Sequence, residues 1–506
     1  MHRVRTQPLM VILLWIAAAA MLLPSAHAAA MGNDRVARAF LLSAAIIAAM
    51  TGLVALARAG RPAGPNPLRR QLVSFALAYV ALPPVLALPF AQSVPDTSFA
   101  NAWFEMVSSL TTTGATLYDT PDRLAPSLHL WRALVGWLGG LLMLVGAAAL
   151  LAPLDLAGAE VISGRAPGRG AAGTSQITRL ADPSERLARL TLLVFPVYAG
   201  LTLALWVLLL IGGERGLHAL CLAMSVLASS GIMPGETLAA SGAGIVTEML
   251  VFMFLLLGLT RRSFPGAVMV DRTHPLKDDP EIRLAAFFLV VVPCLLFLRH
   301  WAGAVRADEV GDLGQAFGAL WGGLFMTLSF LTTAGFESSH WQAARVWSGL
   351  PAPGLILVGL AMIGGGIATT TGGLKLLRVH ALVRQGQREL ERIAHPHSIG
   401  GGGEAERRLR NEGAFAAWIF FMLYALTLAV LMAGLALVEV PFEQALVLAV
   451  SALSTTGPLA QAAAETPIAY SALGGGAKAI LAVAMVLGRL EVLAILALIA
   501  PSVWRR

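Results

Sequence analysis

Long apolar stretches alternate with short polar segments along this chain. A helix needs about 20 residues to cross the hydrocarbon core of a bilayer. Stretches near this length predict ten crossings, near residues 8–29, 36–57, 71–92, 130–153, 190–211, 244–260, 283–301, 347–383, 414–438 and 477–500. The stretch 347–383 is too long for one span and is interrupted by glycines at 364–366 and 372–373. The pattern predicts an all-α polytopic membrane protein.

Composition agrees with this fold class. Of the 506 residues, 57% are hydrophobic and 13% are charged, whereas soluble domains carry about 25% charged residues. The formal charge of +7 comes from basic residues in loops between the apolar stretches, so it indicates topology and not a nucleic-acid partner. The two cysteines, Cys221 and Cys294, have no metal-ligand or redox spacing.

The basic residues also predict an orientation. Of the 36 Lys and Arg residues, 26 fall in alternate segments, 1–6, 58–70, 159–189, 261–283, 375–410 and 505–506. By the positive-inside rule these segments lie inside, with both termini cytoplasmic. An alternative stays open for the first span. Arg3 and Arg5, an apolar core and small residues at 26–28 are also typical of a cleaved signal peptide.

A short motif occurs four times on the predicted outer side. Its pattern is Ser-x-Leu-x-[Ser/Thr]-x-Gly, and it begins at Ser108, Ser225, Ser329 and Ser451. The motif glycines are 117, 104 and 122 residues apart, and each copy lies between two apolar stretches. Each unit is therefore predicted to contain a span, a short re-entrant helix, a polar glycine loop and a second span.

Four such loops can surround one axis. Non-helical backbone at membrane depth is tolerated only where it is buried or faces water, and a glycine can turn carbonyls toward the axis. Rings of carbonyl and hydroxyl oxygens can replace the hydration shell of an alkali cation. The alternative is close helix packing by small residues. The predicted filter residues are Thr112, Thr113, Gly114, Ser229, Ser230, Gly231, Thr333, Ala334, Gly335, Thr455, Thr456 and Gly457.

The interrupted span supplies a candidate gate. Nine of the ten residues from 364 to 373 are Gly, Ala or Thr, so helix propensity is poor and the backbone there is expected to line a cavity. A glycine kink for packing is the alternative. The gate residues are Gly364, Gly365, Gly366, Thr369, Thr370, Thr371, Gly372 and Gly373, with Arg489.

Charges near the spans receive different interpretations. Arg489 is the basic residue placed inside a span, which is by default a functional hypothesis, although a structural ion pair would also explain it. It is not expected to pair with Glu491, two positions along the helix. Lys375 and Arg378 are expected to snorkel to the interface. Asp155, Glu248 and Glu281 lie at span ends and receive no role.

At these motifs the chain resembles the TrkH-type membrane subunits of Trk potassium uptake systems, in the Trk/Ktr/HKT superfamily. The segment from Thr111 to Thr116 resembles the family's first filter loop, Trp137 to Gly140 the helix that follows, Gln385 to Leu390 with His395-Pro396 the inner loop, and Gly488 to Val492 the last helix. The segment from Pro501 to Arg505 resembles the family's tail. The match covers essentially the whole chain.

The resemblance implies a domain organisation. Two N-terminal helices over 1–70 precede four M1–pore helix–M2 repeats around a pseudo-fourfold pore, over 71–158, 159–282, 283–410 and 411–506. The filters would lie at 112–115, 229–232, 333–336 and 455–458. Family members retain a first hydrophobic helix, which favours retention of the first span. Segment 364–373 corresponds to the family's intramembrane loop, and Arg489 to a position that faces the pore.

The resemblance also implies a function. It is potassium uptake across the bacterial inner membrane through a channel-like pore, by a homodimer with a cytosolic nucleotide-binding, TrkA-like regulatory subunit. No cofactor is implied, and potassium is the substrate. Plant relatives that carry sodium have a serine in place of the first filter glycine, and Gly114 is present here. Because the second and fourth loops depart from the family pattern, a sodium or weakly selective transporter is the alternative.

An enzyme is the competing class, and the sequence argues against it. The chain has no His-Glu-x-x-His and no phosphate-binding glycine loop. Its histidines lie mostly in loops, without partners at ligand spacing. One acid, Glu337, lies just outside the third loop, where it could concentrate cations or could be an ordinary solvated loop carboxylate.

Overall fold

The computed structural model describes residues 8–58, 67–152, 183–235, 238, 244–265, 276–307, 313–348, 350, 352–395, 413–464 and 466–491. Every regular element among them is a helix, as the sequence predicts. The α-helices are α2 (Leu9–Ala20), α3 (Leu22–Ala30), α4 (Asp34–Arg58), α5 (Pro67–Ser93), α6 (Phe99–Leu110), α7 (Pro126–Gly146), α10 (Pro183–Ile211), α11 (Gly216–Ala228), α12 (Ile245–Leu255), α13 (Pro280–Ala307), α14 (Leu313–Leu331), α15 (Trp341–Ser348), α16 (Gly354–Ile363), α17 (Leu376–Ala394), α19 (Ala414–Leu437), α20 (Phe442–Leu453), α21 (Leu459–Ala462) and α22 (Gly475–Leu490).

Short helical turns extend or join these helices. The turn η2 (Ala147–Leu151) extends α7, and η5 (Leu256–Leu259) extends α12. The others are η1 (Pro121–Arg123), η6 (Arg261–Ser263), η7 (Leu276–Asp278) and η9 (Tyr470–Ala472).

Seven helices among the described residues are long and apolar enough to cross a membrane. They are Leu9–Ala30, Asp34–Arg58, Pro67–Ser93, Pro126–Leu151, Pro183–Ile211, Pro280–Leu298 and Ala414–Leu437. Seven of the ten predicted crossings are therefore present as continuous helices. The predicted stretch 244–260 forms only the shorter helix Ile245–Leu259, and the last stretch begins as α22 but continues beyond the described residues.

The remaining predicted crossing, 347–383, is broken as expected. It forms α16 and α17, and the segment from Gly364 to Lys375 between them contains no helix. Gly364 and Gly373 have positive φ angles of 73° and 74°, a conformation that glycine adopts without steric cost. The break therefore lies where the sequence places its glycines.

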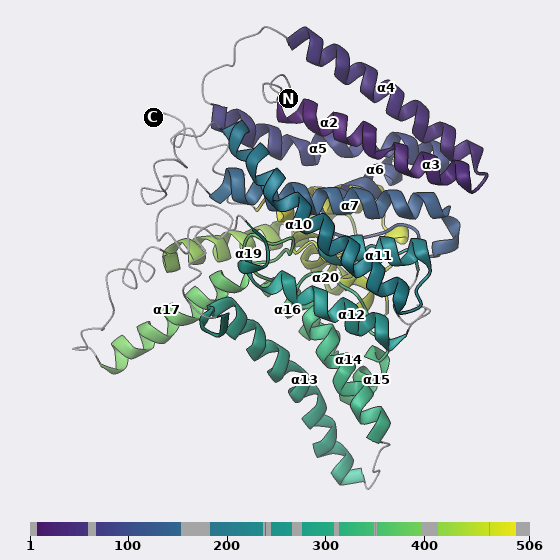
Figure 1. Cartoon of the computed structure of the whole chain (residues 1–506). Helices are drawn as coiled ribbons and strands as arrows, with labels where there is room; N and C mark the ends of the chain where they lie inside the picture. The colour runs from purple at the N-terminus through teal and green to yellow at the C-terminus, as the bar shows by residue number, and fades with distance from the viewer. Residues whose placement is uncertain are drawn as a thin grey trace.

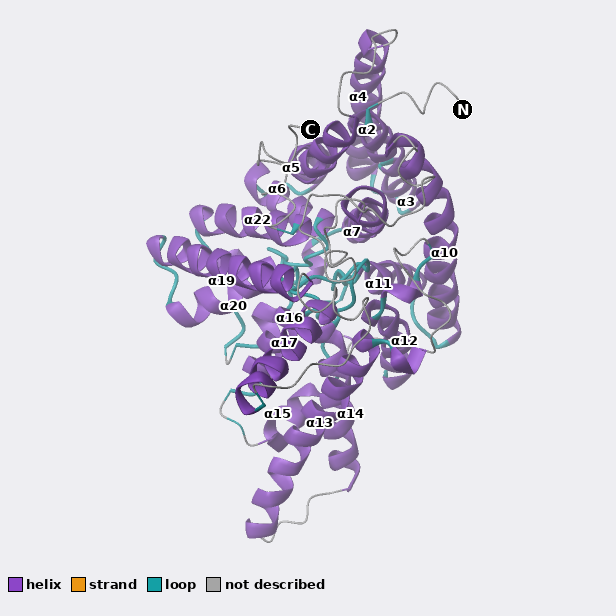
Figure 2. Cartoon of the chain, turned by 90° about the vertical axis from the view of Figure 1, so that its left-hand side faces the viewer, coloured by secondary structure: helices purple, strands orange, loops and turns teal. Residues whose placement is uncertain are grey.

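In four successive parts of the chain, a helix that ends at a motif loop packs between two other helices. The short helix α6 packs against α5 and α7, and α11 packs against α10 and α12. In the same way α14 packs against α13 and α16, and α20 packs against α19 and α22. Of the four, α14 is longer than expected, at 19 residues. The loops that follow these helices gather at the centre of the molecule (Figure 2).

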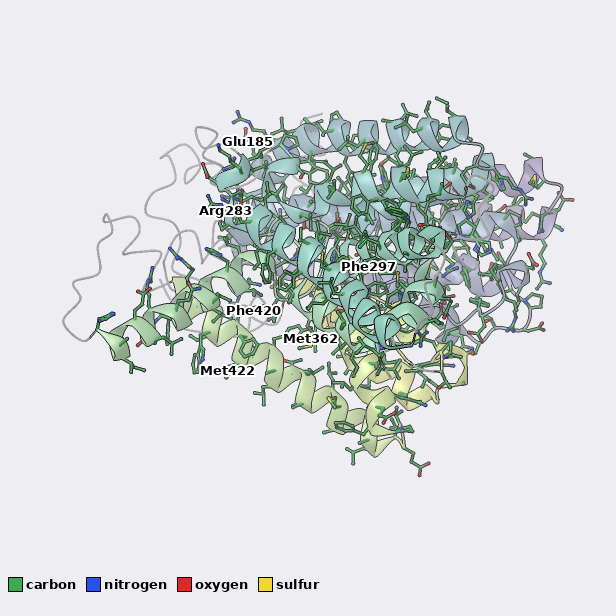
Figure 3. All side chains as sticks on the ribbon, turned by 90° about the horizontal axis from the view of Figure 1, so that it is seen from below. Glu185, Arg283, Phe297, Met362, Phe420 and Met422 are labelled. Atoms are coloured by element: carbon green, nitrogen blue, oxygen red, sulfur yellow. The ribbon has the colours of Figure 1, made fainter. Side chains whose placement is uncertain are left out.

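The N-terminal helices form a layer at one side of this arrangement. Helix α2 packs against α4 and α5, and α3 packs against α4 and α7, so the layer covers the first short-helix unit (Figure 1). The beginnings of α10 and α13, marked by Glu185 and Arg283, lie on the same side as the projecting helix α17 (Figure 3). Segments predicted to lie on one face of the membrane are thus found at one side of the fold.

Candidate functional site

Each of the four short helices ends with the same backbone geometry. The residue at the fifth position of the motif has a left-handed conformation, with φ 55° at Thr112, 50° at Ser229, 55° at Thr333 and 54° at Thr455. The sixth-position N–H donates to the carbonyl of the first-position serine at 2.8–3.0 Å, as from Thr113 to Ser108 and from Ser230 to Ser225. The fifth-position N–H donates to the second-position carbonyl, as from Thr112 to Ser109.

This pair of hydrogen bonds is the Schellman motif, which satisfies the last carbonyls of a helix. Its left-handed position is usually glycine, because a Cβ there costs about 1–2 kcal/mol. Here the position holds threonine or serine in all four copies. The Ser-x-Leu-x-[Ser/Thr]-x-Gly pattern is therefore a helix-stop signal that leaves a buried hydroxyl at the same place in every loop.

The four loops contact one another in sequence order. A Cβ added to Gly114 would lie 2.0 Å from the Ser230 carbonyl oxygen, and one on Gly231 would lie 2.4 Å from that of Ala334. These distances are far shorter than van der Waals contact, so a side chain at either glycine would separate neighbouring loops. The first loop therefore abuts the second, and the second abuts the third.

The third and fourth loops complete the ring. A Cβ added to Gly335 would lie 3.0 Å from the Pro458 ring, and one on Gly457 would lie 2.1 Å from the Ala115 nitrogen. The Gly457 N–H also donates to the Thr113 carbonyl at 2.6 Å. The predicted filter residues thus lie together around a closed ring of four loops from one chain.

The first-position serines fasten the first and third loops, whereas in the second loop Ser225 Oγ lies 3.0 Å from Ser230 Oγ. Ser108 Oγ donates to the Ala115 carbonyl at 2.7 Å, and Ser329 Oγ donates to the Phe336 carbonyl at 2.8 Å. Each bond joins the end of a short helix to the chain one residue beyond the motif glycine. Ser108 and Ser329 therefore hold the first and third loops against the ends of their short helices.

The fourth loop departs from this geometry. Ser451 Oγ donates instead to the Thr456 carbonyl at 2.9 Å, and the Tyr470 hydroxyl contacts both Ser451 Oγ at 2.7 Å and the Gly457 carbonyl at 2.9 Å. Gly114, Gly231 and Gly335 have positive φ angles, whereas Gly457 does not. Directly after the motif, Pro458 is the N-cap of a new short helix, α21, which begins at Leu459.

Buried carboxylates brace the segments that follow the loops. Glu105 pairs with Arg132 at 2.6 Å and accepts the Leu117 N–H at 3.1 Å. Glu248 accepts hydrogen bonds from Trp321 Nε1, Ser338 Oγ, Ser339 N and Ser339 Oγ, at 2.6–2.8 Å. Sequence analysis missed the first and gave Glu248 no role. Their signal in the sequence was an acid within an apolar helix, which predicts a buried partner but does not name it.

The segment from Gly364 to Lys375 lies against the inner ends of the ring. Thr370 Oγ1 is 2.8 Å from Ser229 Oγ and donates to the Leu227 carbonyl at 3.1 Å. The Gly372 N–H donates to Thr333 Oγ1 at 2.7 Å. A Cβ added to Gly372 would lie 2.0 Å from the Ser454 carbonyl oxygen. The predicted gate segment therefore contacts three of the four loops, at or next to their left-handed residues.

The predicted gate arginine contacts the same segment. Arg489 is 2% exposed and its Nη1 donates to the Thr370 carbonyl at 2.6 Å. Its Nε and Nη2 have no hydrogen-bond partner within the part of the chain that the structure describes. Arg489 and Glu491 form no ion pair there, as expected, because Glu491 pairs with Arg378.

The snorkelling prediction for Lys375 and Arg378 is wrong. Both side chains are buried, at 4% and 1% exposed. Arg378 Nη2 lies 2.7 Å from Glu491 Oε2, and the guanidinium stacks 3.7 Å above the ring of Phe420, labelled on α19 in Figure 3. Lys375 Nζ donates to the Thr371 carbonyl. Both cations point inward because backbone oxygens and a carboxylate replace the water that an interface would supply.

Glu281 also has contacts that sequence analysis did not assign. Its carboxylate accepts the Ile367 N–H at 2.8 Å and the Arg261 N–H at 3.2 Å. It thereby joins the beginning of α13 to the segment beneath the loops. Asp155, the third acid considered with it, lies outside the described residues.

On the other side of the third loop, Glu337 is half-buried. Burial raises the pKa of this carboxyl above its usual range, and the nearby Arg345 guanidinium partly offsets the rise in pKa. Glu337 follows the motif glycine by two residues, so its charge lies next to the ring. The site thus combines four loops, a segment beneath them that carries Arg489, and an acid beside one loop.

Comparison with known proteins identifies relatives of this chain. The TrkH family model, described as "Cation transport protein", matches residues 282–505. The chain is 30% identical over 429 residues to the Trk system potassium uptake protein TrkH of Vibrio parahaemolyticus, covering 83% of this chain and 82% of the relative. It is also 30% identical over 433 residues to TrkH of Escherichia coli K12, covering 85% and 84%.

A solved structure shares the fold. The crystal structure of the potassium transporter TrkH from Vibrio parahaemolyticus superimposes with a TM-score of 0.78 over 98% of each chain, at 24% identity. The relatives named above match over most of their own length, and the structural match extends over nearly the whole chain. The chain therefore belongs to the TrkH family of cation transport proteins, and it is a transporter and not an enzyme.

Proposed function

We propose that this protein carries potassium into the cell across the bacterial inner membrane, through the ring formed by its four motif loops. The observation that carries the proposal is the closure of that ring, with four left-handed hydroxyl residues at equivalent positions. Oxygen atoms arranged in this way can replace the hydration shell of a monovalent cation. The relatives named as potassium uptake proteins support potassium as that cation.

The membrane potential supplies the driving force for uptake. Moving one positive charge inward releases about 2.3 kcal/mol per 100 mV. The protein needs no bound cofactor for this step, because the ion itself is the substrate. The four short helices end at the loops, and their carbonyl ends favour a cation nearby.

We further propose that the segment 364–373 and Arg489 form the gate. The bonds from Thr370 and Gly372 to the bases of two loops support this role. Arg489 holds the Thr370 carbonyl and places a positive charge beneath the ring, which raises the barrier to a cation. Flux requires this segment to move away from the loops.

The proposed assembly is a homodimer in which each protomer has its own pore. Both termini lie in the cytoplasm, where a nucleotide-binding regulatory subunit of the TrkA type docks on the basic inner segments. The names of the relatives as parts of a Trk system support a partner of this kind. Helix α17 carries Arg384 and Arg388, and these positive charges support docking on this helix.

Sodium or weakly selective transport is the second candidate, and the fourth loop favours it. Gly457 lacks the positive φ of the other motif glycines, and its carbonyl is held by Tyr470. A ring with one dissimilar quarter presents fewer equivalent oxygens to the ion, so discrimination between potassium and sodium depends on three loops.

The deciding experiment is ion flux into liposomes that contain the purified protein, measured with potassium and with sodium. The proposal requires potassium flux to exceed sodium flux, and growth of an uptake-deficient strain at low potassium when the protein is expressed. Equal fluxes would establish the second candidate. Absence of flux of either ion, with the regulator present, would contradict both.

Selectivity is tested at the closest loop contact. Gly114→Ser places a Cβ at 2.0 Å from the Ser230 carbonyl, so we expect the preference for potassium over sodium to fall at least tenfold. Gly213→Ser is the matched control, because Gly213 also has a positive φ, of 100°, but has open space around it. An unchanged preference for potassium over sodium in Gly114→Ser would show that Gly114 is not part of the filter.

A further inference from the structure

An apolar cavity of about 470 Å³ lies between the N-terminal helix and the first two units of the fold. Its walls come from α2, α5, α7 and α10, together with Leu110 at the end of α6. The volume lies in the range of about 300–1,000 Å³ typical of ligand sites. Neither the pore nor the gate described above uses this space.

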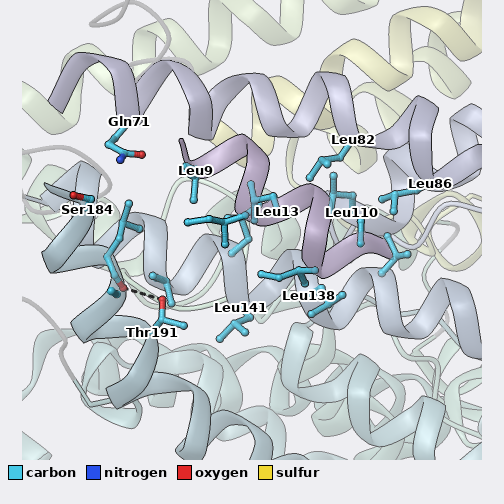
Figure 4. A pocket seen from close by; sticks show the side chains of 18 of the residues that line it. Leu9, Leu13, Gln71, Leu82, Leu86, Leu110, Leu138, Leu141, Ser184 and Thr191 are labelled. Carbon is cyan, nitrogen blue, oxygen red and sulfur yellow. Dashed lines mark hydrogen bonds between the residues drawn. The ribbon is translucent and has the colours of Figure 1, made fainter. Parts of the chain in front are cut away.

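The lining is apolar except at one end (Figure 4). Leu82, Leu86 and Leu110 lie at one end of the cavity, and Gln71, Ser184 and Thr191 lie at the other. The 15 residues from Gln71 to Leu86 correspond to about 22 Å along α5, at 1.5 Å per residue. One leaflet of a bilayer is about 15 Å thick, half of the roughly 30 Å hydrocarbon core. The cavity is long enough for one acyl chain.

The polar end contains an unpartnered group. Gln71 is 7% exposed, and its Oε1 accepts no hydrogen bond from the residues that the structure describes. A buried amide oxygen without a donor is costly, and a ligand that carries a hydroxyl would satisfy it. Thr191 does not compete for this ligand, because its Oγ1 already donates to the Leu187 carbonyl at 2.8 Å.

Positive charge is concentrated around the same end. Arg69 and Arg70 directly precede Gln71 on α5, and Arg186 and Arg189 follow Ser184 on α10. Among the described residues of this group, Glu185 is an acid. The predicted orientation places this end at the inner face of the membrane. Basic residues between helices at that face recognise anionic lipid head groups.

The cavity can be entered from the bilayer. Ile16 on α2 and Leu192 on α10 line it and are 43% and 72% exposed. Large apolar side chains that are exposed on membrane helices face lipid tails. A chain can therefore pass between α2 and α10 without crossing a polar surface.

We propose that this cavity binds one acyl chain of an anionic glycerophospholipid from the inner leaflet. The chain lies along α5 toward Leu110, the phosphate lies among the arginines at the beginnings of α5 and α10, and a hydroxyl of the head group donates to Gln71 Oε1. The chain would then contact the last residue of α6, next to the first loop of the ring.

The test uses the full-length protein in vesicles that contain phosphatidylglycerol with a photoreactive group on one acyl chain. After irradiation, mass spectrometry locates the labelled residues. We expect labelling concentrated on 9–17 and 187–192, and at least a fivefold loss of that labelling in Ala188→Phe, which fills the cavity. Ala204→Phe is the matched control, because Ala204 lies on α10, exposed and outside the cavity.

A second arm tests the head group, with phosphatidylcholine that carries the same photoreactive chain. Labelling at least threefold weaker than with phosphatidylglycerol is expected. Gln71→Leu should lower labelling by phosphatidylglycerol more than labelling by phosphatidylcholine, which has no hydroxyl to donate to Gln71 Oε1. Equal labelling by the two lipids, uniform labelling of all exposed helices, or no effect of Ala188→Phe would overturn the proposal. If Ala188→Phe does not fold, Leu141→Trp replaces it, because Leu141 lines the same cavity. Full labelling in Leu141→Trp would also overturn the proposal.

Discussion

At the scale of single residues, the fifth position of each motif is the most informative. Thr112, Ser229, Thr333 and Thr455 keep a left-handed conformation that costs about 1–2 kcal/mol for a residue with a Cβ. Glycine would remove that cost. A strain retained at four equivalent positions indicates that the hydroxyl has a purpose. In two loops it bonds to the segment beneath, at Ser229 and Thr333.

Substitution of Thr333 tests the hydrogen bond between the third loop and the gate segment. Thr333→Ala leaves the Gly372 N–H without its acceptor, and an unsatisfied buried group costs about 1–3 kcal/mol. The closed position of the segment loses that energy, so ion flux without the regulator should rise about fivefold or more in liposomes. Thr327→Ala is the control, since Thr327 Oγ1 donates to the Gly323 carbonyl within its own helix, α14. An equal rise in both variants would contradict the proposed role of this hydrogen bond.

The pair of Glu105 and Arg132 gives a prediction about stability. Both side chains are buried, so Arg132→Met leaves an uncompensated carboxylate and should lower the free energy of unfolding by about 3–5 kcal/mol. The double variant Glu105→Gln with Arg132→Met removes both charges and should recover most of that loss. Thermal unfolding in detergent measures both. A double variant as unstable as Arg132→Met would show that the charge pair is not the cause.

At the scale of elements, the segment between α16 and α17 is held by main-chain hydrogen bonds as well as by the side-chain bonds described above. The Leu374 and Lys375 N–H groups donate to the carbonyls of Met362 and Ile363, and the Gly366 N–H donates to that of Gly258. Glycines allow these approaches, since a Cβ on Gly364 would lie 2.1 Å from the Gly372 carbonyl oxygen.

Deletion of Thr369, Thr370 and Thr371 tests this element as a gate. The deletion removes the contacts with Ser229 and Arg489, so potassium flux without the regulator should rise at least tenfold in liposomes. Thr427→Val on α19 serves as the control for loss of a threonine hydroxyl, because its Oγ1 donates within its own helix. Unchanged flux in a folded deletion variant would rule out a gating role.

The sequence revealed this element but not its partners. Glycine, alanine and threonine in an apolar stretch predict a helix break wherever they fold, since the preference is local. The partners come from positions far along the chain, such as Glu281, 86 residues from Ile367, and Glu491, 113 residues from Arg378. A local sequence pattern does not identify such distant partners. For this reason Arg378 was expected at the membrane surface and not in a buried ion pair.

At the scale of the whole molecule, the carboxyl of Glu337 beside the third loop carries a charge that depends on pH. Burial raises the pKa of Glu337, so it takes up a proton at a higher pH than an exposed glutamate, whose pKa is about 4.3. Uptake from low potassium should therefore fall as pH falls through this raised pKa. The pH dependence should be weaker in Glu337→Gln, as measured by initial uptake rates. Identical profiles would mean that Glu337 does not attract the ion.

The raised pKa of Glu337 also affects the stability of the fold. Because the folded-state pKa is above the unfolded value, ionised Glu337 lowers the free energy of unfolding at higher pH, and protonation recovers that loss as pH falls. The effect on uptake and the effect on stability thus have opposite signs. Thermal unfolding across the same pH range distinguishes loss of charge from loss of fold.

The arrangement of helices was largely predictable, because each motif contains its own stop signal. The hydrogen bonds of the Schellman motif join residues within six positions of one another, so the repeated pattern fixes each loop locally. The differences between loops depended on neighbours that the pattern does not include. Tyr470 lies 13 residues beyond Gly457 and alters the fourth loop alone.

Because one polypeptide supplies all four loops, each position in the ring is encoded separately. In a pore built from four identical subunits, a single substitution would change every quarter at once. Here the substitution of Gly231 or Gly457 alters one contact and leaves the other three intact. Mutation can therefore change the ion preference of one quarter without changing the other three. A change confined to one quarter produces a loop that differs from the rest, as the fourth loop does.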